Sequence, residues 1–164
     1  MRMAQPTCSI FVDNHPFAWR ADWAWGLPLI VLTVLIHVSG LLLISQRIVH
    51  GAGPVIERRH PKVAFVVVLA ATTWLATCLH GIEAGIWAFA YLFLGALPDL
   101  RSSMLYSLNA MTSYGHTNLN LEDHWRLMGA MEALNGWLLF GLTTAFLFAV
   151  LEKVWLLRSR SEHR

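Results

Sequence analysis

The sequence predicts an all-α membrane protein with three transmembrane helices and one short re-entrant helix. Of its 164 residues, 56% are hydrophobic and only 13% are charged, whereas a soluble domain usually carries about a quarter charged residues. Three long apolar segments, at residues 27–45, 63–97 and 125–157, contribute most of this hydrophobicity. Between the last two lies the polar run NAMTSYGHTN, residues 109–118. This run is where we look first for function.

The first apolar segment, residues 27–45, is long enough to cross a hydrocarbon core of about 30 Å as a helix. Residues 1–26 lack the compact basic region of a signal peptide, so we expect the segment to be retained. Trp19, Trp23 and Trp25 precede it, where tryptophans commonly anchor a helix at the membrane interface. Chance placement in a tryptophan-rich chain explains each of them about equally well.

The second apolar segment, residues 63–97, would be roughly 50 Å long as a single helix, more than a bilayer core needs. We therefore expect it to tilt, kink or project beyond the membrane. Pro98 then fits the first position of a new helix and Asp99 its first turn. The short helix predicted here, residues 99–110, cannot span the membrane. The last long helix is expected over residues 125–157.

Basic residues predict the orientation of the chain. The connector at residues 46–62 and the tail from Lys153 each contain four Lys or Arg, whereas the stretch between the second span and the start of the third has only Arg101 and Arg126. The positive-inside rule places the connector and the tail, including residues 158–164, in the cytoplasm, and residues 1–26 outside. We expect a multi-pass protein of the cell membrane. Because no basic face is interleaved with aromatics, we expect no nucleic-acid partner.

The setting of NAMTSYGHTN is that of a pore loop, with a short helix before it and a long helix after it. Non-helical backbone at membrane depth is tolerated only where protein buries it or where it lines a water-filled path. Ion filters use backbone carbonyls to replace the hydration oxygens of an ion, and glycine supplies the unusual backbone angles they need. The sequence therefore favours a channel over an enzyme.

Over roughly its last hundred residues, and most strongly from Met104 to Val150, the chain resembles the pore-loop potassium channels with two core helices per subunit, here with an extra N-terminal span. Tyr114 and Gly115 match the Tyr-Gly of the family signature Thr-Val-Gly-Tyr-Gly-Asp. Further similarity, some of it to a bacterial subgroup of small ion-channel proteins, lies in Ile86-Trp87-Ala88-Phe89, Trp125-Arg126-Leu127, Glu132-Ala133-Leu134-Asn135-Gly136, Phe140-Gly141-Leu142 and Thr144-Ala145.

The resemblance implies a pore domain over residues 63–157. Its outer helix would be 63–97, its pore helix 99–110, its filter loop 111–118 and its inner helix 125–157. It also implies a homotetramer in the lipid bilayer that passively conducts a monovalent cation, K⁺ by the family's preference, without a cofactor. The filter residues would be Met111, Thr112, Ser113, Tyr114, Gly115 and His116.

Three of these residues differ from the signature. Ser113 replaces its first glycine, where a non-glycine residue at positive φ costs about 1 kcal/mol or more. Met111 lacks the hydroxyl of the signature threonine, and His116 replaces its carboxylate with a ring that is neutral or positive. A register shifted by one residue, with Thr112 as the threonine, is the alternative alignment. Strict potassium selectivity is not expected, and a weakly selective pore or a non-conducting channel-like subunit are the alternatives.

Two glycines and two threonines of the inner helix are candidates for a hinge or for the cavity below the filter. Gly136 occupies the position of the family's hinge glycine, and a hinge and close packing are equally open for it. For Gly141 we favour packing, because glycine is common in membrane helices for this reason. Thr143 or Thr144, but not both, could face the pore squarely, and either hydroxyl could instead bond to its own helix backbone.

His80 and Glu83 lie on one face of the second apolar segment, three residues apart. Ionisable residues within a membrane segment are costly and tend to face the protein interior. We expect a hydrogen-bonded pair that braces the pore helix, rather than a metal site, because His37 could add only a third ligand. Glu132 resembles a filter-supporting carboxylate, with a solvated interfacial residue as the alternative.

A haem- or metal-binding membrane protein is the rival from another functional class. It would use the scattered histidines, but paired ligands usually come from facing helices at similar depth, and no paired pattern recurs in the sequence. We therefore expect no metal and no cofactor. The histidines concerned are His37, His80, His116 and His124.

Overall fold

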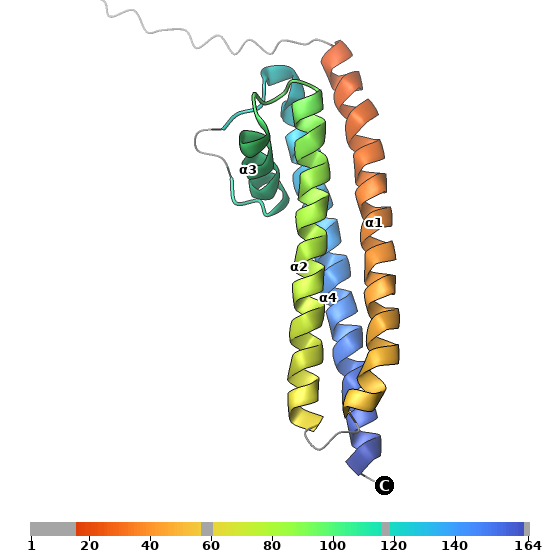
Figure 1. The fold of residues 1–164 in the computed structure, drawn as a ribbon. Coiled ribbons are helices and arrows are strands. Elements are labelled where there is room, and N and C mark those ends of the chain that lie inside the picture. The colour runs from red at the N-terminus through yellow and green to blue at the C-terminus, as the bar shows by residue number, and fades with distance from the viewer. Residues whose placement is uncertain (1–15, 57–60, 116–118, 163–164) are drawn as a thin grey trace, which may run out of the picture.

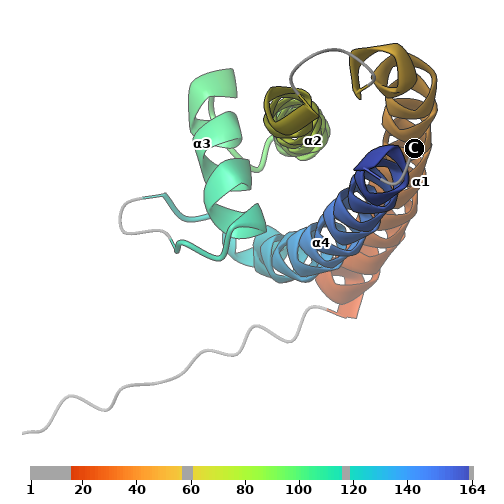
Figure 2. The same ribbon diagram turned by 90° about the horizontal axis from the view of Figure 1, so that it is seen from below.

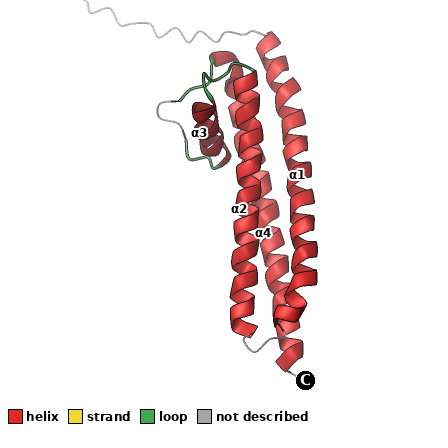
Figure 3. Ribbon diagram, in the orientation of Figure 1, coloured by secondary structure: helices red, strands yellow, loops and turns green. Residues whose placement is uncertain are grey.

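The computed structural model describes residues 16–56, 61–115 and 119–162, and the regular structure within these ranges is helical (Figure 3). Its α-helices are α1 (Pro16–Ile56), α2 (Pro61–Phe93), α3 (Leu100–Met111) and α4 (Arg126–Glu162), and a single 3-10 turn, Asp123–Trp125, leads into α4 (Figure 1). The long helices α1, α2 and α4 lie side by side, with α2 antiparallel to the other two.

Each long helix contains a stretch that is long and apolar enough to cross a membrane. These stretches are Trp19–Arg47, Val66–Phe93 and Arg126–Lys153. The prediction of an all-helical chain with three candidate membrane spans is thereby confirmed. Because hydropathy marks only the apolar part of a helix, the predicted bounds are too short for α1, which takes in parts of the predicted N-terminal segment and connector.

The second helix ends earlier than predicted, at Phe93 instead of Leu97, because the chain makes a helix-terminating turn. Gly95 has a φ of 68°. Its N–H donates to the Leu92 carbonyl at 3.1 Å, and the Ala96 N–H donates to the Tyr91 carbonyl at 2.9 Å. This pair of bonds is the Schellman motif, in which glycine is the usual residue at the left-handed position.

The short helix α3 begins one residue later than predicted, because Asp99 is its N-cap and not a member of its first turn. The Asp99 carboxylate accepts from the Ser102 N–H at 2.9 Å and from the Ser102 hydroxyl at 2.8 Å. A capping carboxylate satisfies donors that have no partner within the helix and interacts favourably with the helix dipole. The cap thereby fixes the point at which the chain turns back along α2.

The fold places α3 beside α2 and α4, on the side away from α1 (Figure 2). It starts near the end of the bundle where α2 finishes, and it runs partway down the bundle. The chain then returns to the same end before α4 begins (Figure 1). The described part of the 112–122 connection therefore lies alongside the bundle and does not run to its other end.

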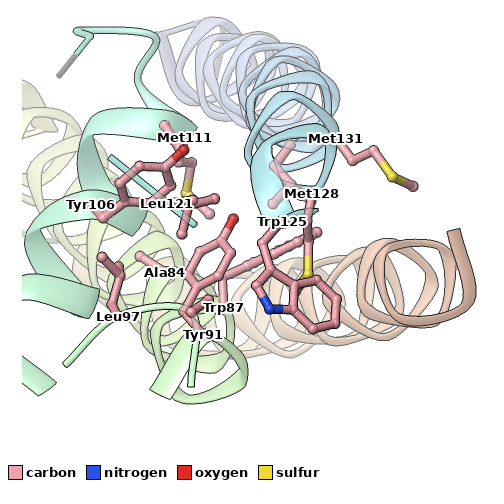
Figure 4. Packing of buried hydrophobic residues seen from close by; sticks show 13 residues of the cluster. Ala84, Trp87, Tyr91, Leu97, Tyr106, Met111, Leu121, Trp125, Met128 and Met131 are labelled. Carbon is pink, nitrogen blue, oxygen red and sulfur yellow. The ribbon is translucent and has the colours of Figure 1, made fainter. Parts of the chain in front are cut away.

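The hydrophobic core lies at the α3 end of the bundle. Figure 4 shows side chains from α2, α3 and α4 gathered there. Tyr91 and Tyr106 meet edge to face with ring centroids 5.3 Å apart, a favourable aromatic geometry. Trp87, Tyr91 and Met128 are fully buried. The best-packed part of the molecule is thus the part that holds α3 against the long helices.

We predict that the Asp99 cap makes stability depend on pH. The hydrogen bonds from the Ser102 N–H, and next from its hydroxyl, lower the pKa of the Asp99 carboxyl below its usual value. A lowered pKa in the folded state means that the cap contributes fully above about pH 4 and is lost as the pH falls through the folded pKa. Melting of Asp99→Ala in detergent should start several degrees below that of the native chain at pH 6, and the gap should narrow on acidification.

The matched control is Asp99→Asn, which keeps a capping side chain without an ionisable group. Its melting temperature should depend less on pH than that of the native chain between pH 6 and pH 3. A gap between native chain and Asp99→Ala that stays constant over this interval would contradict the assigned role of the carboxylate.

Candidate functional site

The backbone after α3 takes left-handed conformations at two positions of the predicted filter. Ser113 has a φ of 54° and Gly115 a φ of 91°, and Ser113 is the one non-glycine residue with positive φ among the described residues. In the ungapped alignment these positions carry the two glycines of the potassium-channel signature. The backbone therefore has, at both positions, the conformation for which glycine is normally required.

A second Schellman motif produces this geometry at the end of α3. The Ser113 N–H donates to the Ala110 carbonyl, and the Tyr114 N–H donates to the Asn109 carbonyl, both at 3.0 Å. Ser113 thus occupies the left-handed position that follows the C-cap Thr112. Its hydroxyl oxygen accepts from the indole N–H of Trp137 at 3.0 Å, which ties the turn to α4.

The predicted filter side chains lie in different environments. Met111 is buried, and the Thr112 hydroxyl donates to the Leu108 carbonyl of its own helix at 2.7 Å. Tyr114 does not pack behind the loop within the single chain, because 85% of it is exposed. His116 and the following two residues of the predicted loop lie outside the described residues.

At Gly136, α4 closely approaches the backbone at the end of α3. A Cβ atom at this position would overlap the backbone carbonyl of Met111. Gly129 lies two turns earlier on α4, and a Cβ atom there would overlap the Tyr106 hydroxyl. Close packing therefore explains Gly136, whereas a Cβ atom at Gly141 would have no atom of the described residues within 4 Å. The packing expected for Gly141 is not observed within the chain.

Glu132 holds α3 against the two long helices beside it. Its carboxyl group is fully buried and accepts from the Tyr91 hydroxyl of α2 at 2.6 Å. Its other oxygen is hydrogen-bonded to the Ser107 hydroxyl of α3, which also lies 2.7 Å from the Ala84 carbonyl oxygen. A protonated carboxyl satisfies all of these contacts, because Ser107 can then donate to Ala84 while accepting from Glu132. Glu132 is therefore not a solvated interfacial residue.

A second polar cluster lies between α1, α2 and α4 and consists of His37, His80, Glu83 and Thr143. His37 Nδ1 lies 2.8 Å from Glu83 Oε1, and His80 Nδ1 lies 3.3 Å from Glu83 Oε2. The opposite ring atoms, His37 Nε2 and His80 Nε2, lie 3.0 Å and 2.9 Å from Thr143 Oγ1. The four side chains form a closed cycle of polar contacts, which we call the polar ring.

The contacts of the polar ring fit an ionised Glu83 with two neutral imidazoles. His37 Nδ1–H then donates to Glu83, Thr143 donates to His37 Nε2, and His80 Nε2–H donates to Thr143. These are the contacts with hydrogen-bond geometry. At the remaining edge the His80 Nδ1 lone pair faces Glu83 Oε2, and neither of these buried atoms has a hydrogen-bond partner among the described residues. In this arrangement the edge between His80 and Glu83 therefore has two acceptor atoms and no hydrogen between them.

The polar ring joins helices other than those predicted. His80 and Glu83 contact α1 through His37 and α4 through Thr143, so the expectation that they brace the short helix α3 is wrong. The sequence indicated a polar pair on one helix face but gave no inter-helix register to bring His37 and Thr143 to it. A further link between α1 and α4 that the sequence did not reveal is the hydrogen bond from Asn135 to the Thr33 hydroxyl, at 2.9 Å.

The two neighbouring threonines of α4 face opposite surroundings. Thr143 is buried in the polar ring. Thr144 is exposed on the surface of the chain, and its hydroxyl donates to the Phe140 carbonyl of its own helix at 2.8 Å.

The chain matches no family model, no curated protein and no solved structure in the comparisons made with it. The loop after α3 and the polar ring are the two features of the structure that bear on function. Within the polar ring, His37, His80 and Glu83 each offer a ligand atom, and these atoms lie within 4.8 Å of one another. This is the one group of potential metal ligands found among the described residues.

We predict that Gly136→Ala destabilises the protein, whereas Gly141→Ala does not. The added methyl group at Gly136 would force α3 away from α4, and overpacking of this kind costs about 1–3 kcal/mol. At Gly141 the space is open, and replacing glycine in a helix by alanine is expected to gain about 0.5–1 kcal/mol. The free energy of unfolding in mixed detergent micelles measures both effects. Equal effects of the two substitutions would contradict the packing assignment.

A second matched pair tests the polar ring. Thr143→Val removes the hydroxyl that faces both imidazoles and should lower the free energy of unfolding by about 1–3 kcal/mol, because buried polar groups lose their partners. Thr144→Val changes an exposed hydroxyl and should stay within about 0.5 kcal/mol of the native value. The same unfolding assay compares them. A Thr143→Val protein as stable as Thr144→Val would show that the contacts at Nε2 contribute nothing.

Proposed function

We propose that the chain is the subunit of a pore-loop cation channel of potassium-channel type, which assembles as a homotetramer in the cell membrane. The N-terminus would lie outside and the C-terminus in the cytoplasm. Each subunit would contribute α3 as pore helix and the following turn as filter, with α2 as outer and α4 as inner helix. Conduction would be passive and would require no cofactor.

The observation that carries this proposal is the pair of left-handed residues directly after the short helix α3. This helix runs partway along the bundle, and the chain then returns to the end from which α3 started. Positive φ at Ser113 and Gly115 coincides with the two glycine positions of the signature. Left-handed residues allow successive carbonyl groups to turn towards one side, as a cation path requires. The C-terminal end of α3 precedes this turn, and the negative end of a helix dipole attracts cations.

The exposed aromatic surface around the loop supports assembly from several chains. Tyr114 is 85% exposed and Trp137, which is bonded to Ser113, is 70% exposed. Leu134, three residues before Trp137, and Leu138, four residues after Leu134, extend the exposed face of α4. One chain has one such loop, so a central pore requires neighbouring copies around a symmetry axis, and closed rotational symmetry is the rule for homo-oligomers.

The side chains of the proposed filter argue against strict potassium selectivity. Met111 is buried and carries no hydroxyl, and Thr112 donates its hydroxyl proton to its own helix. In the signature, the threonine hydroxyls supply the innermost ring of oxygen atoms. Met111, at the same position, offers no oxygen in its side chain. We propose a weakly selective cation pore, with a non-conducting channel-like subunit as the opposing outcome.

Ion flux through the purified protein tests the proposal. Reconstituted in planar bilayers, the native chain should carry a cation current that barium reduces, and the reversal potential should separate K⁺ from Na⁺ only weakly. Gly115→Ala should reduce the current about tenfold or more, because a left-handed residue other than glycine costs roughly 1–2 kcal/mol. Gly85→Ala is the matched control, since a Cβ atom at that helical position would meet open space.

Cross-linking of the reconstituted protein makes each result interpretable. Current from native tetramers that Gly115→Ala lowers and Gly85→Ala preserves would support a filter at this turn. Absence of current from native tetramers would overturn the channel proposal in favour of a non-conducting subunit. Current that is equal in both variants would place the ion path elsewhere.

A further inference from the structure

We propose that the polar ring is a binding site for a divalent transition-metal ion of zinc chemistry, with His37, His80 and Glu83 as its ligands. The site lies between α1, α2 and α4, away from the turn after α3. The site is inferred from the geometry and hydrogen bonding of these residues, and it does not depend on ion conduction. It changes the expectation from the sequence, in which two ligands on one helix were too few.

The ligand set suits a first-row transition metal. Two imidazole nitrogens and one carboxylate oxygen, with an open fourth position, are a recurring set in zinc sites. Imidazole also binds Cu, Fe and Ni, whereas Mg²⁺ and Ca²⁺ prefer shells made of oxygen. The polar ring supplies only one carboxylate, that of Glu83. Its chemistry therefore selects the transition metals over the alkaline-earth ions.

The separations are close to those that a tetrahedral ion needs. Bonds of about 2.0–2.1 Å place neighbouring ligand atoms of a tetrahedral zinc site roughly 3.3 Å apart. His80 Nδ1 and Glu83 Oε2 already have a separation of 3.3 Å. The three ligand groups lie within 4.8 Å of one another, so no pair needs to approach by more than about 1.5 Å to reach the tetrahedral spacing.

The unpartnered atoms of the polar ring point to a missing cation. His80 Nδ1 and Glu83 Oε2 are buried, face each other and have no hydrogen-bond partner among the described residues. Glu83 is fully buried, and a buried carboxylate without full compensation is costly. A cation between the two atoms accepts both lone pairs and offsets the negative charge. The His80 side chain is 12% exposed, which leaves one ligand within reach of an arriving ion.

Thr143 has the position of the residue that orients metal-bound histidines. Such histidines donate their second ring N–H to an oxygen, which fixes the tautomer and the direction of the ring. With the ion held at both Nδ1 atoms, the single proton of the neutral His37 ring moves from Nδ1 to Nε2, so both imidazoles carry their proton at Nε2. Thr143 Oγ1 lies 3.0 Å and 2.9 Å from these nitrogens and has two lone pairs to accept them.

A proton is the competing occupant of the same edge. It would convert one imidazole to its charged form and leave the polar ring neutral overall, with each of its contacts supplied with one hydrogen. A metal ion differs from a proton in stoichiometric binding, in its spectrum and in its removal by chelators. The two occupants are therefore separable on the native protein by direct measurement.

Cobalt uptake is the proposed experiment, because Co²⁺ occupies zinc sites and absorbs visible light according to its ligand geometry. The full chain, purified in detergent and stripped with chelator, should bind one Co²⁺ per chain with a four-coordinate spectrum, and Zn²⁺ should displace it. Glu83→Gln and His80→Gln should each abolish the spectrum. His124→Gln is the matched control and should leave it unchanged, because His124 is exposed outside the polar ring.

Thr143 provides a test that leaves all three ligands in place. Thr143→Val should weaken Co²⁺ binding about 10–100-fold, the usual effect of losing the partner of a metal-bound histidine. Thr143→Ser, which keeps the hydroxyl, should restore binding. Gel filtration and circular dichroism establish that each compared protein is folded.

X-ray absorption of the zinc-loaded native chain keeps the proposal falsifiable if the ligand variants do not fold. The expected zinc shell contains two imidazoles and oxygen. The proposal is overturned if the native chain takes up neither Co²⁺ nor Zn²⁺, which assigns the edge to a proton, or if the zinc shell lacks two imidazoles. It is also overturned if folded His80→Gln binds Co²⁺ as the native chain does. None of these results depends on whether the protein conducts ions.

Discussion

The buried carboxyl group of Glu132 is the contact on which the arrangement of α3 depends. It is hydrogen-bonded to Tyr91 of α2 and to Ser107 of α3 while belonging to α4 itself. In a bilayer, lipid tails are as apolar as leucine, so apolar surface alone does little to hold a short helix against long ones. Hydrogen bonds and close packing must do so instead. At this end of the bundle, Glu132 provides the hydrogen bonds, and Gly129 and Gly136 allow the close packing.

The same constraint explains how α1 is held to the other two long helices. Two of its polar links among the described residues are the hydrogen bond of Thr33 with Asn135 and the contacts of His37 in the polar ring. Small residues let the helices approach closely, since a Cβ atom at Gly40 would overlap the Leu79 side chain. The long helices are therefore joined at separate levels, with α1 fixed to α4 and α2 independently of α3. An ion bound to the polar ring would strengthen the link between α1 and α2.

The sequence was informative where a local rule applies and uninformative where the register between helices decides. The apolar segments predicted the three long helices, and Asp99 marked the start of α3 to within one residue, because span length and capping are local properties. The partners of Glu83 could not be predicted. His37 is one of several histidines in the chain, and only the packing of α1 against α2 brings it to the Glu83 carboxylate. The place of Thr143 in the polar ring could not be predicted for the same reason, because it depends on how the helices pack.

The left-handed turn after α3 arises from helix termination more than from the signature sequence. Ser113 adopts a φ of 54° although it is not glycine, because the Schellman bonds of Ser113 and Tyr114 close the helix and Trp137 donates to the serine hydroxyl. The backbone of Met111 packs directly against Gly136 of α4, and this contact fixes the position of the turn. The serine at this position therefore has a backbone angle for which glycine is the usual residue. If the turn lines an ion path as proposed, the departures from the signature alter the oxygen atoms that the side chains offer, while the backbone geometry is retained. The contribution of each side chain to selectivity can then be separated from that of the fold, because α3 is held by residues outside the loop.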